Sequence, residues 1–236
     1  MTANQQLITY LNRHVELIGK VVDFDPATDR LYHLDFTEGN KSLKEDIFRD
    51  TEKFSDWITK RLQINNARYG IGGYFEHRTI YARSEHFDTI DEPRRLHLGM
   101  DIWAEAGTKV YVPLGGTIHS FKNNNHFGDY GPTIILQHNL DGLALYSLYG
   151  HLSKASLSGL EVGAILAPNQ MLATFGNSTE NGHWPSHLHF QLMFDLEGNE
   201  GDYPGVCRFS EMERYKPNIP DPQLVLRFPD AVNKSF

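Results

Sequence analysis

The stretch SHLHFQL, residues 186–192, alternates polar and apolar side chains along its whole length. Such alternation is typical of a β-strand, because successive side chains of a strand point to opposite faces of the sheet. One face then carries His187, His189 and Gln191, and the apolar residues between them face a core. The two imidazoles lie about 6.6 Å apart along this strand, at about 3.3 Å per residue. The stretch therefore predicts a β domain whose sheet presents a pair of histidines.

The same kind of pattern extends from about residue 70 to residue 200, where short apolar or alternating runs are separated by Gly, Pro and Asn. The predicted strands are Tyr74–Ala82, Leu98–Trp103, Lys109–Val112, Gly116–Phe121, Thr133–His138, Leu143–Leu148, Ala164–Thr174 and Leu188–Phe194. No amphipathic helix is evident between residues 97 and 200. We therefore expect a mainly β fold, with an antiparallel sheet or a barrel-like arrangement.

Residues 1–69 are predicted to form a small α+β segment in front of this domain. Apolar residues recur at helical spacing from Leu7 to Ile18, and Gly19 is the expected end of that helix. Weak alternation over residues 31–37 predicts a short strand.

A second helix is predicted to begin at a capping box formed by Ser42 and Glu45, whose side chains have the required spacing. The glycine-rich run at residues 68–73 marks the boundary with the β domain, which is expected to occupy residues 70–200. From residue 201 to residue 236 we expect an extended tail, because proline is frequent from Pro217 onward.

The composition excludes several classes of protein. Hydrophobic residues make up 40% of the 236 residues, which is enough to form a core, and the net charge is -8. An acidic chain without a basic patch is poorly suited to nucleic acid, and no apolar run of about 18 residues is present for membrane insertion. The N-terminus lacks the features of a secretory signal, so a cytoplasmic protein is expected. The single cysteine, Cys207, excludes an internal disulfide, and the oligomeric state is left open.

Two further motifs carry residues of metal-binding type. In His97-Leu98-Gly99-Met100-Asp101, the histidine and the aspartate would lie about 13 Å apart in a straight strand, too far to share a metal ion. Gly99 allows a sharp bend that brings them together. His151 follows Gly150 at the end of an apolar strand, a position typical of a cleft rim. Taken alone, each motif also fits an ordinary solvent-exposed histidine.

Taken together, the three motifs predict a metal centre. His97, Asp101 and one histidine of the 187/189 pair form a set of two imidazoles and one carboxylate, which suits Zn²⁺ and leaves a fourth position for water. Two histidines remain for acid–base catalysis, with ordinary pKa values that suit neutral pH. A metal-bound water and a histidine base are the groups that hydrolysis of an amide bond requires.

The order H-x-x-x-D, then a histidine after a strand, then H-x-H resembles the signature of the lysostaphin-type (LytM-like) zinc metalloendopeptidases, over roughly residues 70–200. The resemblance implies one zinc ion per chain, held by His97, Asp101 and His189. It implies catalytic roles for His151 and His187, which would orient the metal-bound water and stabilise the oxyanion. It also implies an antiparallel β fold with the site in a groove, and a glycine-containing peptide of the bacterial cell wall as substrate.

A closer resemblance concerns residues 130–138, 184–192 and 201–208. These stretches are similar to the middle domain of bacterial fusion proteins that join an aminoglycoside-phosphotransferase-like kinase, a peptidase-like domain and a class III aminotransferase. In that setting the substrate need not be cell wall. Two alternatives to a peptidase therefore stay open: a zinc-containing module that binds a peptide or a partner without catalysis, and a hydrolase of a small amino compound.

Other polar residues are candidates for supporting roles around such a site. Asp129 and Glu76 are expected acceptors that would orient a ligand imidazole. A latent form would have a protein side chain in the fourth zinc position. The candidates for this position are Asn40, Asn65 and Asn66. The histidines considered as neighbours of the groove are His86, His138 and His183.

Overall fold

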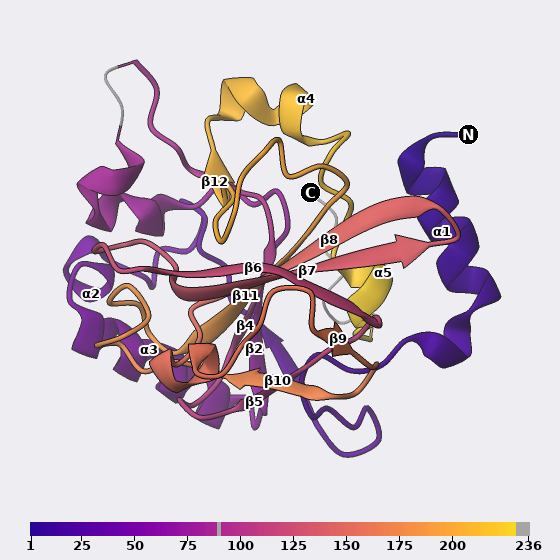
Figure 1. The fold of residues 1–236 in the computed structure, drawn as a ribbon. Helices are drawn as coiled ribbons and strands as arrows, with labels where there is room; N and C mark the ends of the chain where they lie inside the picture. The colour runs from indigo at the N-terminus through magenta and orange to yellow at the C-terminus, as the bar shows by residue number, and fades with distance from the viewer. Residues whose placement is uncertain (89–90, 230–236) are drawn as a thin grey trace.

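An eight-stranded sheet forms the centre of the molecule, in the order β1-β2-β4-β11-β8-β7-β6-β9 (Figure 1). The computed structural model describes residues 1–88 and 91–229, so residues 230–236 of the predicted tail lie outside the described residues. All neighbouring strands are antiparallel except β1 and β2, which are parallel. The predicted mainly β class is confirmed. In sheet order the strands are Leu31–His33, Tyr69–Gly72, Met100–Trp103, His187–Met193, Leu143–Gly150, Gly131–Leu140, Gly116–Asn124 and Ile165–Leu166.

Two small sheets and five short or medium α-helices complete the described part of the chain. β5 (Lys109–Tyr111) pairs with β10 (Met171–Thr174), and β3 (Leu96–His97) pairs with β12 (Val206–Cys207). The α-helices are α1 Ala3–Arg13, α2 Glu45–Phe48, α3 Thr51–Ile64, α4 Met212–Tyr215 and α5 Gln223–Leu226. Short 3₁₀ helices span Val15–Leu17, Thr79–Arg83, Glu85–Phe87, Lys154–Leu157 and Phe209–Glu211.

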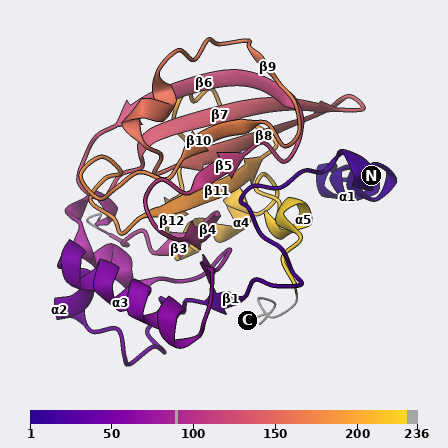
Figure 2. The ribbon, with the colours of Figure 1, turned by 90° about the horizontal axis from the view of Figure 1, so that it is seen from below.

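Four of the five described α-helices lie in two groups, and α4 lies apart from both (Figure 1). Figures 1 and 2 show α2 and α3 together at one end and α1 with α5 at the other. α1 contacts both α5 and β8, so the two ends of the described chain meet beside the sheet. None of the described helices is long and apolar enough to cross a membrane.

The two faces of the sheet differ in the way that the alternation at residues 186–192 predicts. On one face Leu188, Phe190 and Leu192 join a large apolar cluster. On the opposite face His187 and His189 are also buried, because other segments cover them. One such cover is a second apolar cluster, which contains Phe54 of α3, Trp103 of β4 and Trp184.

Two predicted helices at the N-terminal side are wrong in detail. The first helix ends at Arg13 instead of Gly19, because Val15 and Leu17 are exposed and do not extend its apolar face. The capping box does not form: the Ser42 hydroxyl donates to Asn40, and the helix is broken into α2 and α3. Asp50 caps α3 by accepting from the backbone N–H groups of residues 52 and 53.

The predicted strand over residues 74–82 is also wrong. Phe75 has a positive φ of 53°, which turns the chain after β2, and residues 79–83 form a 3₁₀ helix. The predicted strand over residues 164–174 is split in two, because Asn169 adopts a positive φ of 65° between β9 and β10. The glycine-rich run at residues 68–73 contains β2, a fully buried strand of the main sheet.

The C-terminal stretch is not an extended tail over its described length. β12, α4 and α5 form within it, and β12 pairs with β3 beside His97. Its apolar residues explain this outcome, because Tyr203, Tyr215 and Ile219 are buried in a third apolar cluster.

Candidate metal centre

β3, β4 and β11 together position the predicted ligands. The antiparallel pairing of β4 with β11 sets His189 opposite Asp101 and His187 opposite Trp103. Residues directly opposite each other point to the same face, so Asp101 and His189 share one. His97 ends β3, and the break at residues 98–99 turns the chain so that its side chain reaches the same place.

Gly99 makes the expected bend possible because it has no side chain, and not because its backbone adopts a left-handed conformation. A β-carbon at residue 99 would lie 2.6 Å from His189 Nε2 and 2.8 Å from the carbonyl oxygen of Phe190. Its φ does not lie in the left-handed region. The glycine is therefore required because the imidazole of His189 occupies the space of a side chain.

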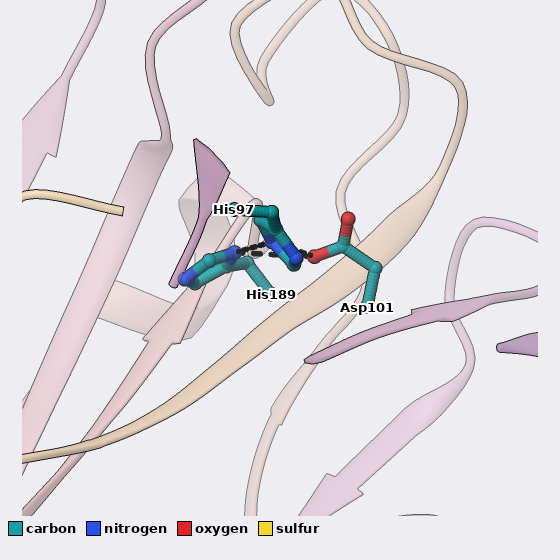
Figure 3. A group of neighbouring side chains, drawn as sticks. All are labelled: His97, Asp101 and His189. Carbon is teal, nitrogen blue, oxygen red and sulfur yellow. Dashed lines mark hydrogen bonds and ion pairs between the residues drawn. The ribbon is translucent and has the colours of Figure 1, made fainter. Parts of the chain in front are cut away.

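The three predicted ligands converge in a buried cluster, which Figure 3 shows. His97 Nε2 lies 2.9 Å from His189 Nδ1 and 3.2 Å from Asp101 Oδ1. His189 Nδ1 lies 3.1 Å from the same carboxylate oxygen. Three ligands of a tetrahedral zinc ion, each at 2.0–2.1 Å, lie about 3.3 Å apart, so the three atoms have nearly the spacing of a zinc site.

The hydrogen bonds behind this cluster determine where its protons lie. His97 Nδ1 lies 2.8 Å from the carbonyl oxygen of Gly73, which accepts only, so the proton of His97 is on Nδ1. Gln191 Nε2 donates to the carbonyl of Pro204, so its Oε1 accepts from His189 Nε2 at 2.9 Å. The atoms that face one another, His97 Nε2, His189 Nδ1 and Asp101 Oδ1, therefore all carry lone pairs and no proton.

The surroundings of the cluster keep His97 neutral and Asp101 ionised. Burial and the nearby Arg78 guanidinium lower the pKa of His97 to about 3. Burial alone would raise the pKa of Asp101, but His97 and Arg78 outweigh it and hold the pKa well below its ordinary value. A neutral imidazole and an ionised carboxylate are the forms that bind a metal ion.

Arg78 is a site residue that the sequence analysis missed. Its side chain is fully buried, and Nη1 donates to Asp101 Oδ2 at 2.5 Å. Its Nε donates to Glu76 Oε2 at 2.7 Å. Glu76, expected to orient a ligand imidazole, instead contacts this arginine. Arg78 thus occupies one oxygen of Asp101 and leaves the other, Oδ1, to the two histidines.

His151 and His187 lie next to the ligand cluster as a pair. Their ring centroids are 4.1 Å apart, and His187 also stacks on Trp103 at 3.9 Å. Nδ1 of His151 donates to the Asn181 carbonyl and Nδ1 of His187 to the Pro185 carbonyl, each at 2.8 Å. Both Nε2 atoms are therefore unprotonated.

The expectation of ordinary pKa values for these two histidines is wrong. Burial lowers the pKa of His187 to about 4. Burial and the neighbouring His187 hold the pKa of His151 well below its ordinary value. His151 also has a positive φ of 60°, a strained conformation of the kind that clusters at functional sites.

A cavity of about 220 Å³ opens beside these groups. Asp101, His151, His187 and His189 line it, together with aromatic side chains and residues 202–206. His86 and Asp129 also line it, whereas His138 is buried between Gly115 and Ser147. Of the asparagines considered as a fourth ligand, Asn40 donates to the Asp35 carbonyl and Asn65 to the Arg61 carbonyl, and Asn66 lines a different cavity.

The comparisons with known proteins agree with a peptidase segment in this chain. Residues 95–201 match the model of peptidase family M23, and all five predicted site residues lie within this range. No curated protein sequence matches the chain significantly.

Two solved structures illustrate the likeness. The catalytic domain of the antimicrobial peptidase lysostaphin from Staphylococcus simulans is 24% identical, with a TM-score of 0.42, over 74% of this chain and 98% of that domain. A zinc-containing peptidase from Vibrio cholerae is 23% identical, with a TM-score of 0.34, over 42% of this chain. The chain spans only 27% of the length of that second protein.

Proposed function

We propose that this protein is a zinc-dependent metallopeptidase that hydrolyses a peptide bond, with His97, Asp101 and His189 as zinc ligands. One observation carries the proposal: three buried lone-pair atoms face one another at 2.9–3.2 Å with no proton between them. Such atoms repel one another unless a cation lies between them. Two imidazoles and one carboxylate are a donor set that suits zinc. The match to peptidase family M23 supports the same conclusion.

Zinc bound there supplies a Lewis acid that polarises the substrate carbonyl and lowers the pKa of water. We assign the proton transfers to His151 and His187, whose Nε2 atoms carry lone pairs and whose Nδ1 protons are held by backbone carbonyls. An Nε2 atom accepts a proton from the attacking water and, once protonated, donates to the oxyanion or to the leaving amine.

For the substrate we propose a glycine-containing peptide, with cell-wall peptides as the broader class. This proposal rests on the resemblance of the sequence motifs to the lysostaphin-type peptidases; the names of the similar solved structures indicate peptidases and no particular peptide. The similarity to the middle domain of kinase and aminotransferase fusion proteins, and a location in the cytoplasm, stay predictions from the sequence.

Metal content tests the ligand assignment first. Elemental analysis of the purified chain, stripped and then reloaded with zinc, is expected to find about one zinc per chain, and His189→Ala is expected to lose it. No stoichiometric zinc in the reloaded protein would contradict the proposal.

Hydrolysis of a panel of glycine-containing peptides tests the reaction. The zinc-loaded protein is expected to cleave at least one of them. His187→Ala should retain zinc and lose about 100-fold or more in kcat, which is the range of general acid–base catalysis. Turnover that survives in His187→Ala would remove the role assigned to this histidine.

A further inference from the structure

The two histidines assigned to proton transfer, here called the histidine pair, depend on one short stretch of chain, the 181–185 segment. His151 Nδ1 donates to the carbonyl of Asn181, and His187 Nδ1 donates to the carbonyl of Pro185, each at 2.8 Å. A carbonyl oxygen only accepts, so each contact keeps the proton on Nδ1 and leaves Nε2 with its lone pair. The position of this segment therefore sets the tautomer of both imidazoles.

The middle of the 181–185 segment has a backbone conformation that its sequence only partly favours. Gly182 and His183 have positive φ values of 82° and 66°. Glycine adopts such values readily, whereas a histidine keeps them only where the surrounding structure holds it. The carbonyl of His183 is held by two side chains from outside the segment.

Thr51 and Arg83 are the side chains that hold this carbonyl. The Thr51 hydroxyl donates to the His183 oxygen at 3.0 Å, and Arg83 Nη2 donates to the same oxygen at 3.1 Å. Arg83 Nη2 also donates to the Thr51 hydroxyl at 2.7 Å, so the three groups form a closed set of hydrogen bonds. Thr51 begins α3 and Arg83 ends a 3₁₀ helix, and both precede the range that matches peptidase family M23.

Arg83 contacts the 181–185 segment at a second point, the ring of Trp184. Its side chain is buried, and the central carbon of the guanidinium lies 4.6 Å from the centre of that ring. The ring of Trp184 in turn lies 6.3 Å from the rings of both His151 and His187. Burying a cation is costly unless its partners compensate, so the groups that Arg83 contacts indicate what it does. Those groups belong to the segment that holds the histidine pair.

We propose that Arg83 and Thr51 are positioning residues: they fix the 181–185 segment, whose carbonyl groups keep both Nε2 atoms of the histidine pair free to accept a proton. This inference rests on the proposed metallopeptidase function, which gives the histidine pair its role. The side-chain hydrogen bonds of both residues go to the segment and to each other. Their removal is therefore expected to leave the zinc ligands in place.

Nitrogen NMR of the histidine rings tests the positioning without relying on turnover. In the zinc-loaded wild type, both rings of the histidine pair are expected to show a protonated Nδ1 and an unprotonated Nε2. In Thr51→Val and Arg83→Met the Nδ1 protons should exchange with water about 5-fold faster or more, the factor that corresponds to one lost hydrogen bond. Thr51→Val has nearly the shape of threonine and is expected to fold even if Arg83→Met does not. Unchanged tautomers and exchange rates in the variants would overturn the proposal.

Kinetics with a peptide that the wild type cleaves test the consequence for the reaction. Thr51→Val should lower kcat about 2- to 10-fold, as expected for one hydrogen bond. Arg83→Met should lower it about 10- to 100-fold, because a small displacement of a reacting group causes losses of this size. KM and zinc content should stay close to the wild-type values. Wild-type kcat in both variants, or a loss of zinc that accounts for the lost activity, would overturn the proposal.

Two control variants separate positioning from a general effect of substitution. Thr51→Ser keeps the hydroxyl and should restore most of the kcat that Thr51→Val loses. Arg61→Met removes an arginine of α3 that makes the same kinds of contact, with the Trp57 ring and the Ser42 hydroxyl. It should keep the wild-type kcat and histidine spectra. Losses in these controls as large as in Thr51→Val and Arg83→Met would overturn the proposal.

The outcomes also separate this inference from the proposed function. Altered tautomers or exchange rates in the variants of a protein that cleaves no peptide would contradict the peptidase function and leave the positioning. Peptide cleavage by the wild type, with unchanged histidine spectra and kcat in the variants, would contradict the positioning alone.

Discussion

Arg78 determines which oxygen of Asp101 is free for a metal ion. Its contact with Oδ2 leaves Oδ1 directed at the two histidines, and Glu76 holds the guanidinium from the other side. Groups that orient a metal ligand in this way affect metal affinity without touching the metal.

Replacing Arg78 is therefore expected to weaken zinc binding. In Arg78→Met, Asp101 and Glu76 become unpaired buried carboxylates, and zinc affinity measured by chelator competition should fall about 10- to 100-fold. Arg78→Lys should lie between this variant and the wild type, because lysine keeps the charge and loses the planar fork. The control is Arg83→Met, which removes a buried arginine that contacts Thr51 and His183 instead of a ligand. Equal affinity in Arg78→Met and the control would contradict the role.

The sequence pointed to His97, Asp101, His151, His187 and His189 because their side chains are chemically suited to metal binding or proton transfer. Arg78 has no such signature. Its position depends on the turn at Phe75, where a residue other than glycine adopts a positive φ. No local rule predicts that conformation for phenylalanine, so the burial of Arg78 was not predictable from the sequence.

At the scale of elements, the accuracy of the predictions follows the strength of the local pattern. β11 was predicted within one residue of its observed bounds, since its alternation matches a strand with two buried faces of different kinds. The strand predicted over residues 74–82 failed because apolar residues in a tight turn and in a strand look alike in sequence. The helix α5 was not predicted, because three nearby prolines indicated an extended chain. Pro222 is nevertheless compatible with the start of a helix.

His138 connects β7 to two neighbouring segments and gives the fold a sensitivity to acid. Its ring contacts the Gly115 carbonyl and the Ser147 hydroxyl, and burial lowers its pKa to about 4. The unfolded chain binds a proton here from about pH 6.5 downward, whereas the folded chain does not. The stabilisation from this residue is therefore complete above about pH 6.5 and is lost as the pH falls to about 4.

Urea unfolding of the metal-free protein at pH 7 and pH 4 measures this loss. The wild type is expected to lose about 3 kcal/mol more than His138→Gln between these two pH values. The comparison with the variant is needed because His97, His151 and His187 have pKa shifts in the same direction. The same pH dependence in both proteins would contradict a buried neutral His138.

At the scale of the whole molecule, the candidate site depends on chain outside the segment that matches peptidase family M23. Gly73 and Arg78 precede that segment, and both contact its predicted ligands. Pro204 follows it and holds Gln191, which orients His189. Residues from three stretches of the chain therefore meet at one cluster, and a metal ion there is coupled to the folding of all three.

This coupling predicts that zinc stabilises the entire chain. Zinc at a free concentration 100 times its Kd is expected to add about 2.7 kcal/mol to the free energy of unfolding. In a chain of this length each kcal/mol raises Tm by about 2–4 °C, so a rise of about 5–10 °C is expected in calorimetry. His189→Ala should lose the rise and Trp57→Phe should keep it, because only His189 belongs to the ligand cluster. A single transition that moves as a whole indicates that the three stretches unfold together. A separate transition at lower temperature, with a Tm that zinc does not change, would show that at least one of these stretches unfolds independently of the site.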